Sequence, residues 1–375
     1  MIEISKLKKK QFSLIMHLKL AGTELFKFKT NDCLSPIGWH IIHCLYVECI
    51  WIRSYFFGDN LLVNKLKNIA DSNKIKPKNR GLILPEYNYL YEFSKNEFNK
   101  NLILCNKIKS RKKLLYFLQF LINHHSQHLE TIKIILNLIN LKNKNAPIKS
   151  FSKIEEKVFN FNPVYIKEGY YKIGTSSSNK FSYDNEKPEF IKKLKSFLIS
   201  KNLIRIDEWL CFLNSGGYKK KSLWSKAGWD WKCKNKITHP LGWKINKESL
   251  SISTAYGYEK PNKDKPVSNI SFYELEAFAN WVKLKIPHEF QWEAANSNLL
   301  DKYKVWEWHN NKFFPYENFM PYPYDEYSLP WFNNNYYTLR GASIFSETEL
   351  KRKTFRNFYQ PHIRFIFSGG RLSTN

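Results

Sequence analysis

Residues 115–140 restrict the fold of this chain more than any other stretch, because they form one long apolar run that carries three histidines. Leucine, isoleucine and phenylalanine recur in it at helical spacing, and no glycine or proline interrupts it, so the pattern predicts a helix. His124 and His128 lie four residues apart and project from one face of that helix, whereas His125 points about 100° away. Two imidazoles one turn apart can bind the same metal ion.

A second apolar helix is predicted over residues 36–57, and it contains His40 and His43. If the two helices pack together, His43 supplies a third imidazole to the pair on the first helix. Histidines on helices are also common as surface residues or as core residues with satisfied hydrogen bonds, and the His-x-x-x-His spacing occurs by chance. The spacing alone therefore leaves both a metal site and ordinary packing open.

The chain of 375 residues is long enough for two domains, and a hydrophobic fraction of 43% is sufficient to build their cores. The first domain is predicted to be a four-helix bundle over residues 1–146, with a polar loop at 71–87. A linker rich in lysine, asparagine, proline and serine follows it. The helices of the bundle are expected at about 7–30, 36–57, 88–107 and 111–142.

The second domain is predicted over residues 155–375, where tryptophan, tyrosine, glycine and proline become frequent and the strand patterns are short and irregular. These features indicate an α+β domain with long loops, held together by aromatic packing. The predicted fold class of the whole chain is therefore α+β with two domains. Helical patterns in this half are expected only at about 189–200, 205–215, 271–284 and 288–296.

The net charge of +27 would ordinarily indicate an anionic partner, but the basic residues are spread along the whole chain. Lysine, asparagine and isoleucine are all overused, which is the composition that AT-rich codons produce. We therefore expect no specific nucleic-acid partner and no membrane partner. Contact with nucleic acid or with an anionic membrane is the alternative.

Six cysteines without any Cys-x-x-Cys pair indicate reduced, buried thiols in a cytoplasmic protein. The start of the chain is basic, but His17 and Lys19 interrupt its apolar run, so no signal peptide is predicted. The helix at 36–57 is long enough to span a membrane. Its histidine and charged side chains indicate a buried bundle helix instead.

Several motifs occur in the same order as in one known family. In the second half they are FSYDNEKP at 181–188, LNSGGYKKKSLWSKAGWDW at 213–231, PVSNISFYELEAFANWVKLKIPHEFQWEAA at 266–295, VWEWH at 305–309, PYPYDEYSLPWF at 321–332, LRGAS at 339–343 and FRNFYQPHIRFIFSGGRL at 355–372. This set resembles the formylglycine-generating-enzyme or sulfatase-modifying-factor fold, a variant of the C-type-lectin fold. The first half resembles a DinB-like helical bundle through SPIGWHIIHCLYVE at 35–48 and HHSQHLE at 124–130. This order of domains is similar to that of the iron-dependent sulfoxide synthases of ergothioneine biosynthesis, the EgtB-type enzymes.

Resemblance to that family implies a non-haem iron ion, Fe(2+), held by three histidines, one from the WHxxH stretch and two from His-x-x-x-His. By position these are His43, His124 and His128. Ligation by neutral imidazoles leaves positions on the metal open for O₂ and a thiolate substrate. Three histidines are also a common ligand set for catalytic zinc, so the preference for iron comes from the resemblance alone.

The reaction that the resemblance implies is oxidative C–S bond formation between a small thiol, cysteine or γ-glutamylcysteine, and a histidine betaine such as hercynine. By position, Tyr324 matches the family's proton donor and Tyr327 matches a residue of the betaine pocket. Gln127 and Asn357 match further substrate-binding positions. Arg80 lies where the family often places an arginine for the carboxylate of the thiol. A purely structural role is the alternative for each of them, since buried and surface aromatic residues are abundant in this chain.

Some positions depart from the family pattern. Tyr359 stands where enzymes that use γ-glutamylcysteine often carry an acidic residue, and a neutral phenol cannot pair with the ammonium group of that substrate. Cysteine or another small thiol is therefore favoured. The chain has no cysteine after Cys233, and formylglycine-generating enzymes bind copper through a C-terminal cysteine pair, which excludes that activity. Arg356 and Arg371 are expected to hold the C-terminal core.

The leading hypothesis is a cytoplasmic non-haem iron oxidoreductase, a sulfoxide synthase that uses a thiol, a histidine-derived acceptor and O₂. A related iron oxidoreductase that acts on another small molecule or peptide is the second hypothesis. A catalytically inactive lectin-like binding module is the third. The sequence makes no prediction of the oligomeric state.

Overall fold

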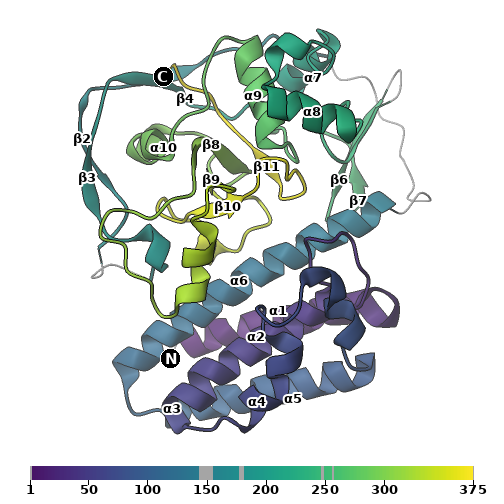
Figure 1. Cartoon of the computed structure of the whole chain (residues 1–375), viewed down its shortest axis with the longest axis vertical. Helices are drawn as coiled ribbons and strands as arrows, with labels where there is room; N and C mark the ends of the chain where they lie inside the picture. The colour runs from purple at the N-terminus through teal and green to yellow at the C-terminus, as the bar shows by residue number, and fades with distance from the viewer. Residues whose placement is uncertain (1, 143–154, 177–180, 246–248, 256, 375) are drawn as a thin grey trace. The chain divides into compact units, whose positions relative to one another are not determined.

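The computed structural model describes residues 2–142, 155–176, 181–245, 249–255 and 257–374. The chain divides into two compact units (Figure 1). The first comprises Met1–Ile139 and Phe345–Leu350, and the second comprises Asn140–Ile344 and Lys351–Asn375. The predicted linker falls on residues 143–154, which lie outside the described residues.

The first unit is a helical bundle, as the sequence pattern predicted. α2, the π-helix η1 and α3 follow one another without a gap and together form the helix that was predicted over 36–57. α4 was not predicted, and the predicted loop contains the 3-10 helix η2. The elements are α1 (Ile2–Leu25), α2 (Ile37–Glu48), η1 (Cys49–Ser54), α3 (Tyr55–Phe57), α4 (Leu61–Ala70), η2 (Pro77–Ile83), α5 (Tyr87–Lys107) and α6 (Arg111–Lys142).

Local sequence explains where these helices begin and end. α6 continues for 32 residues because it contains no helix-breaking residue and buries a face of leucine, isoleucine and phenylalanine. Gly22 has a φ of 60° and kinks α1, which ends at Leu25 and not at residue 30 as predicted. Among the residues that the structure describes, none of the helices has both the length and the hydrophobicity needed to span a bilayer.

A short segment from the second half of the chain, Phe345–Leu350, belongs to the first unit. Ion pairs hold it there, because Glu347 lies 2.7 Å from Lys10 Nζ on α1 and 2.9 Å from Lys133 Nζ on α6. The chain therefore returns to the bundle more than 200 residues after α6. Lys133 and Glu347, which form one of these ion pairs, are 214 positions apart in the sequence. No pattern in the sequence indicated this connection.

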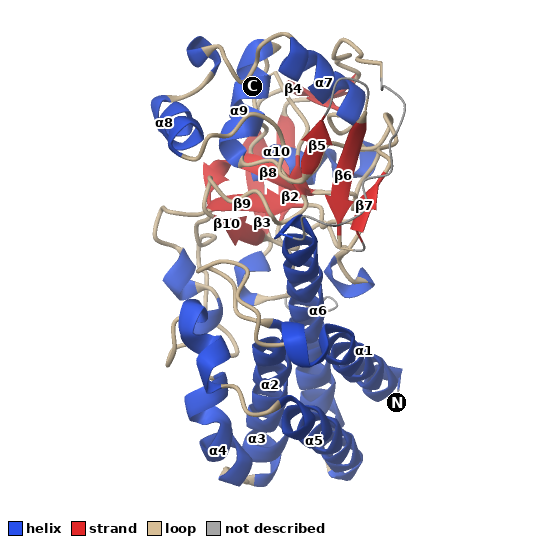
Figure 2. Ribbon diagram, turned by 90° about the vertical axis from the view of Figure 1, so that its right-hand side faces the viewer, coloured by secondary structure: helices blue, strands red, loops and turns tan. Residues whose placement is uncertain are grey.

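The second unit is an α+β domain of short strands and helices, as predicted (Figure 2). Its four-stranded sheet has the order β10-β9-β8-β11, in which β11 runs parallel to β8 and the other pairs are antiparallel. β1 pairs with β4, β2 pairs with β3, and β5, β6 and β7 form a further antiparallel sheet. The strands are β1 (Pro163–Ile166), β2 (Gly169–Ile173), β3 (Phe190–Leu194), β4 (Phe197–Ser200), β5 (Trp243–Ile245), β6 (Leu250–Thr254), β7 (Gly257–Glu259), β8 (Trp306–Lys312), β9 (Tyr337–Arg340), β10 (Asn357–Tyr359) and β11 (Ser368–Gly369). The helices are α7 (Ile206–Asn214), α8 (Lys226–Lys234), α9 (Phe272–Trp281) and α10 (Glu289–Ala295), with 3-10 helices η3 (Asp184–Glu186), η4 (Lys221–Leu223), η5 (Asn296–Asn298), η6 (Asp325–Tyr327) and η7 (Leu329–Trp331); η8 (Thr348–Leu350) lies in the first unit.

One predicted helix is wrong, because residues 189–200 form the strands β3 and β4. Phe190 and Leu194 are four residues apart, and this spacing places two side chains on the same face of a helix and also on the same face of a strand. Pairing with β2 and β1 decides the outcome in favour of strands. α7, α9 and α10 confirm the other three predicted segments, whereas α8 was not predicted.

All six cysteines are free thiols, but not all of them are buried. Cys44, Cys49 and Cys105 are buried in the bundle, as predicted. The prediction of burial is wrong for Cys33 and Cys233, which are exposed. The first lies in a polar turn between α1 and α2, and the second lies between two lysines in the last turn of α8.

Buried ion pairs hold the C-terminal core of the second unit. Glu289, at the start of α10, lies 2.7 Å from Arg340 Nη1 and 2.8 Å from Arg356 Nη2. Arg371 Nε lies 2.6 Å from Glu307 on β8. All five side chains are almost completely buried. Arg356 and Arg371 therefore hold the core, as the sequence predicted.

Replacement of Glu289 tests this ion pair. Burial raises the pKa of Glu289, but the guanidinium groups of Arg356 and Arg340 outweigh this effect and bring the pKa to about 2. The ionised carboxylate therefore contributes stability above the ordinary glutamate pKa of 4.5, and that contribution is lost as the pH falls towards 2. Glu289→Gln should lower the free energy of unfolding at neutral pH by about 3–5 kcal/mol in denaturant titrations. The neutral amide would leave the buried positive charges of Arg340 and Arg356 without the negative charge that balances them. The exposed Glu317→Gln is the control and should cost nothing measurable; an equally small effect of Glu289→Gln would contradict the assignment.

Candidate metal centre

Three histidines of the first unit converge at one point inside the bundle. His43 comes from α2, and His124 and His128 come from successive turns of α6. One ring nitrogen of each residue lies within 4.8 Å of the other two. His43 and His124 are buried and His128 is half-buried. The structure thus brings together the three residues that the sequence nominated as metal ligands.

A backbone carbonyl fixes the orientation of His43. Its Nδ1 lies 2.7 Å from the carbonyl oxygen of Ala70, at the end of α4. Only a protonated nitrogen can donate this bond, so the neutral ring carries its hydrogen on Nδ1 and keeps a lone pair on Nε2. Trp39 stacks on the same ring with centroids 4.5 Å apart. His43 therefore presents Nε2 as the nitrogen that is able to bind a metal ion.

The Nε2 atoms of His124 and His128 lie 3.2 Å apart. Two neutral imidazoles make such a contact only when one nitrogen carries a hydrogen and the other accepts it. For a divalent cation to bind both lone pairs, that hydrogen would have to move to the other nitrogen of its own ring, and the ring would stay neutral. Metal–nitrogen bonds of about 2.0–2.1 Å are compatible with a separation of this size between two ligand atoms. The donor set therefore fits a divalent transition metal such as iron(II) or zinc.

Two further histidines contact the three candidate ligands. His40 Nδ1 lies 2.8 Å from His128 Nδ1, and His125 Nδ1 lies 3.4 Å from His124 Nδ1. Each contact uses the ring nitrogen that does not take part in the His124–His128 contact, so each can orient a ligand ring. Neither residue was predicted from the sequence to have a role. The available signal was their position in apolar helices, where a buried imidazole needs a hydrogen-bond partner.

Burial keeps the cluster uncharged. Burial lowers the pKa of His43 to about 4 and the pKa of His40 to about 3, and the neighbouring guanidinium of Arg80 adds to both effects. The pKa values of His124 and His128 also lie well below the ordinary value, first because of burial and then because of the surrounding histidines. Neutral imidazole is the form that binds metal ions.

Two predicted substrate-binding residues lie in the first unit. The guanidinium of Arg80 lies 3.8 Å from the ring centroid of Trp39, the residue that stacks on one of the candidate ligands. Arg80 donates hydrogen bonds to two backbone carbonyls and to Ser35 Oγ. Each of its terminal nitrogens carries a second N–H group, which is the donor a carboxylate requires. Gln127 is half-buried on α6, next to His128.

The other predicted site residues lie in the second unit. The ring of Tyr324, which directly precedes η6, meets the ring of Tyr327 edge-on with centroids 6.4 Å apart. Tyr327 stacks on Tyr183 at 4.2 Å. Asn357 opens β10, and its Oδ1 accepts a hydrogen bond from the next backbone N–H. Burial raises the pKa of Tyr324, and the carboxylate of Asp184 adds to the effect, so the phenol is protonated at neutral pH.

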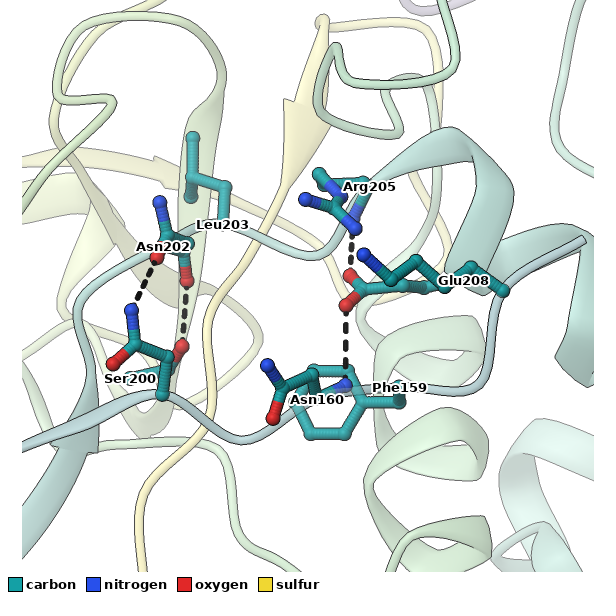
Figure 3. A pocket seen from close by; sticks show the side chains of 9 residues that line it. Phe159, Asn160, Ser200, Asn202, Leu203, Arg205 and Glu208 are labelled. Atoms are coloured by element: carbon teal, nitrogen blue, oxygen red, sulfur yellow. Dashed lines mark hydrogen bonds between the residues drawn. The ribbon is translucent and has the colours of Figure 1, made fainter.

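A polar hollow of the second unit is lined by different residues (Figure 3). Asn162 Nδ2 donates a hydrogen bond to Asn202 Oδ1 at 3.1 Å. The backbone N–H groups of Asn160 and Arg205 donate to the carboxylate of Glu208. These polar groups are engaged with one another, and none of the predicted site residues lines the hollow.

Comparison with known families agrees with the resemblance predicted from the motifs in the second half of the chain. Residues 151–304 match the sequence model of the Sulfatase-modifying factor enzyme 1-like domain. This range contains the motifs at 181–188, 213–231 and 266–295. The chain therefore combines a helical bundle with a sulfatase-modifying-factor domain, as the resemblance predicted.

Comparison with curated proteins extends the likeness to nearly the whole chain. Hercynine oxygenase of Mycolicibacterium smegmatis is 26% identical over 419 residues, which cover 92% of this chain and 92% of that protein. Hercynine oxygenase of Mycobacterium tuberculosis is 28% identical over 239 residues, or 51% of this chain and 56% of that protein. The match to the Mycobacterium tuberculosis protein thus spans about half the length of that protein. The match to hercynine oxygenase of Mycolicibacterium thermoresistibile covers 54% of that protein. These similarities agree with the resemblance to EgtB-type proteins that the motifs predicted.

Solved structures also align with the chain. PvdO from Pseudomonas aeruginosa is 14% identical and covers 59% of this chain and 99% of its own, with a TM-score of 0.40. Treponema denticola variable protein 1 is 12% identical and covers 58% of this chain and 98% of its own, with a TM-score of 0.38.

The lowered pKa values predict how metal binding depends on pH. Protons compete with a metal ion for an imidazole only below the pKa of that imidazole. Because the pKa of His43 is about 4 and those of His124 and His128 are also lowered, Co²⁺ affinity should stay constant down to about pH 5, measured by optical titration. An affinity that already falls steeply below about pH 6.5, the ordinary histidine value, would show that the cluster is not buried and neutral.

Proposed function

We propose that this protein is a non-haem iron oxidoreductase that joins a small thiol to a histidine betaine such as hercynine, with O₂ as the oxidant. A C–H bond of the imidazole and the S–H bond of the thiol break, and a C–S bond and an S–O bond form. The second oxygen atom leaves as water with the two hydrogens, so O₂ accepts four electrons in all. The acceptor class is supported by similarity to hercynine oxygenases, one of which aligns with 92% of the chain.

The observation that carries the proposal is the convergence of His43, His124 and His128 as neutral imidazoles inside the bundle. When bound, iron(II) supplies the one-electron chemistry that reaction with O₂ requires. The three histidines would hold it through Nε2 and leave the remaining positions to the substrates. Because neutral imidazoles add no negative charge, the site keeps the positive charge that favours a thiolate over a thiol.

The residues that match the family's catalytic and substrate positions are proposed to act on the substrates. Tyr324, which matches the position of the family's proton donor and carries a protonated phenol at neutral pH, is proposed as the proton donor. Tyr327 offers an aromatic face, which attracts a trimethylammonium cation. Gln127 and Asn357 supply amide groups for hydrogen bonds with the substrates. Arg80, already fixed by three hydrogen bonds, supplies a preorganised donor for a carboxylate.

Cysteine is proposed as the thiol in preference to γ-glutamylcysteine. The longer substrate carries an ammonium group that a carboxylate would pair with. Tyr359, half-buried on β10, stands at the position where that carboxylate is expected. A protonated phenol has no charge to offer an ammonium group at neutral pH.

Oxygen uptake tests the reaction. Full-length protein purified without oxygen and loaded with Fe(II) should consume O₂ only when hercynine and a thiol are both present, and mass spectrometry should detect a sulfoxide-linked product. His128→Ala should abolish iron binding and O₂ uptake while the thermal midpoint stays close to that of the parent. His17→Ala, a half-buried histidine on α1 outside the cluster, is the control. Retained uptake in His128→Ala would rule out the assignment, and bound iron without uptake would favour a related oxidoreductase with another substrate.

The proton donor has a test of its own. Tyr324→Phe removes one hydroxyl and should lower the rate of product formation by about 10²–10⁴-fold, the range for loss of a general acid. Iron affinity should not change, because the residue is not one of the proposed ligands. Tyr337→Phe, a half-buried tyrosine that stacks on Phe272, is the matched control. Equal rates for the two variants would remove Tyr324 from the mechanism.

A further inference from the structure

A carboxylate is buried in the middle of the helical bundle. Glu48, the last residue of α2, has no exposed surface. Gln11 Nε2 donates to both of its oxygens at 2.9 Å, and Asn101 Nδ2 donates to Oε2 at 3.0 Å. His125 Nε2 lies 2.7 Å from Oε1. Three helices, α1, α5 and α6, thus direct hydrogen-bond donors at one carboxylate.

The hydrogen bond to Glu48 decides which nitrogen of His125 carries the hydrogen. Nε2 donates to the carboxylate, so in the neutral ring Nδ1 keeps a lone pair. That lone pair faces His124 Nδ1 at 3.4 Å, a distance at which it accepts a hydrogen bond from a protonated Nδ1. His124 then keeps its own lone pair on Nε2, the atom that lies 3.2 Å from His128 Nε2.

We propose that Glu48 and His125 are positioning residues that hold His124 in the tautomer and orientation in which Nε2 can bind a metal ion. The proposal rests on the metal site of the proposed function and adds the residues that prepare it. In the usual carboxylate–histidine–metal arrangement, the carboxylate accepts a hydrogen bond from the metal-binding histidine itself. Here a second histidine, His125, lies between the carboxylate of Glu48 and the candidate ligand His124. The two side chains touch no substrate and act only through His124.

The energetic cost of this arrangement indicates more than packing. Removing a carboxylate from water costs several kcal/mol, which only well-placed donors offset. An apolar residue at position 48 would fill the same space in a bundle core without that cost. The π-helix η1 begins at the next residue, Cys49, and such wide turns inside helices are frequent at functional sites.

The tautomer of His124 can be measured without any metal. ¹⁵N NMR of the full-length, metal-free protein labelled at histidine should show His124 protonated on Nδ1, with its resonances assigned through His124→Gln. In Glu48→Gln, an amide can accept from His125 through its oxygen or donate to it through its nitrogen, so the preference should be lost and both tautomers of His124 should appear. Glu97→Gln changes a buried carboxylate of α5 that binds Arg53 and not His125, and it should leave the tautomer unchanged.

Metal affinity gives the second readout. His125→Leu removes the acceptor and should weaken Co²⁺ binding by about 10–100-fold, the usual effect of losing such a partner. His125→Asn places an amide oxygen near the former Nδ1 and should restore most of the affinity. Thermal unfolding of each variant reports whether the bundle is folded.

Each result decides between two conclusions. Nδ1 protonation of His124 in the parent protein, together with weaker Co²⁺ binding in His125→Leu than in His125→Asn, supports the positioning role. Protonation of His124 on Nε2, or equal affinity of both variants and the parent, overturns it. A parent protein that binds no Co²⁺ would refute the metal site of the proposed function, and the NMR tautomer would still decide whether Glu48 and His125 orient His124.

Discussion

Burial of glutamate side chains among hydrogen-bond and ion-pair donors is the constraint on which both units depend. Glu48 in the bundle and Glu289 in the second unit are both completely buried, and each is surrounded by donors from distant parts of the sequence. Because a stranded buried charge costs several kcal/mol, helices or strands that shifted in register would lose more than packing contacts. The two carboxylates therefore specify how the elements around them assemble, in a way that apolar contacts of similar size do not.

Local features of the sequence predicted most of the bundle and the core of its candidate site. Periodicity gave the long helices, and a four-residue spacing placed His124 and His128 on one face of α6. The atoms that orient the imidazoles were out of reach of this reasoning. The carbonyl that fixes His43 belongs to Ala70, in a helix that was not predicted, and Glu48 meets His125 only after α2 and α6 have packed.

The second unit shows where local patterns become ambiguous. Residues 189–200 satisfy helical and strand spacing equally, and pairing with β1 and β2 decides between them. Arg356 and Arg371 were predictable as core residues through the resemblance of the FRN and GGRL motifs to the family, and the structure pairs them with Glu289 and Glu307. The return of Phe345–Leu350 to the bundle was not predictable, since its ion pairs join residues more than 200 positions apart.

The three candidate ligands are oriented by three different kinds of partner, and this has a consequence for stability. A backbone carbonyl holds His43, a histidine contacts His128, and a histidine bound to a carboxylate contacts His124. Each partner is part of the bundle core, so the geometry at the Nε2 atoms exists only when α2, α4 and α6 are packed. A metal ion that binds this geometry and not the unfolded chain would stabilise the bundle by about 2.7 kcal/mol at a free concentration of 100 times Kd. Folding of the first unit and binding of an ion at the candidate metal centre would thus be one coupled equilibrium, in which the buried polar network defines the site and the ion would in turn stabilise the network.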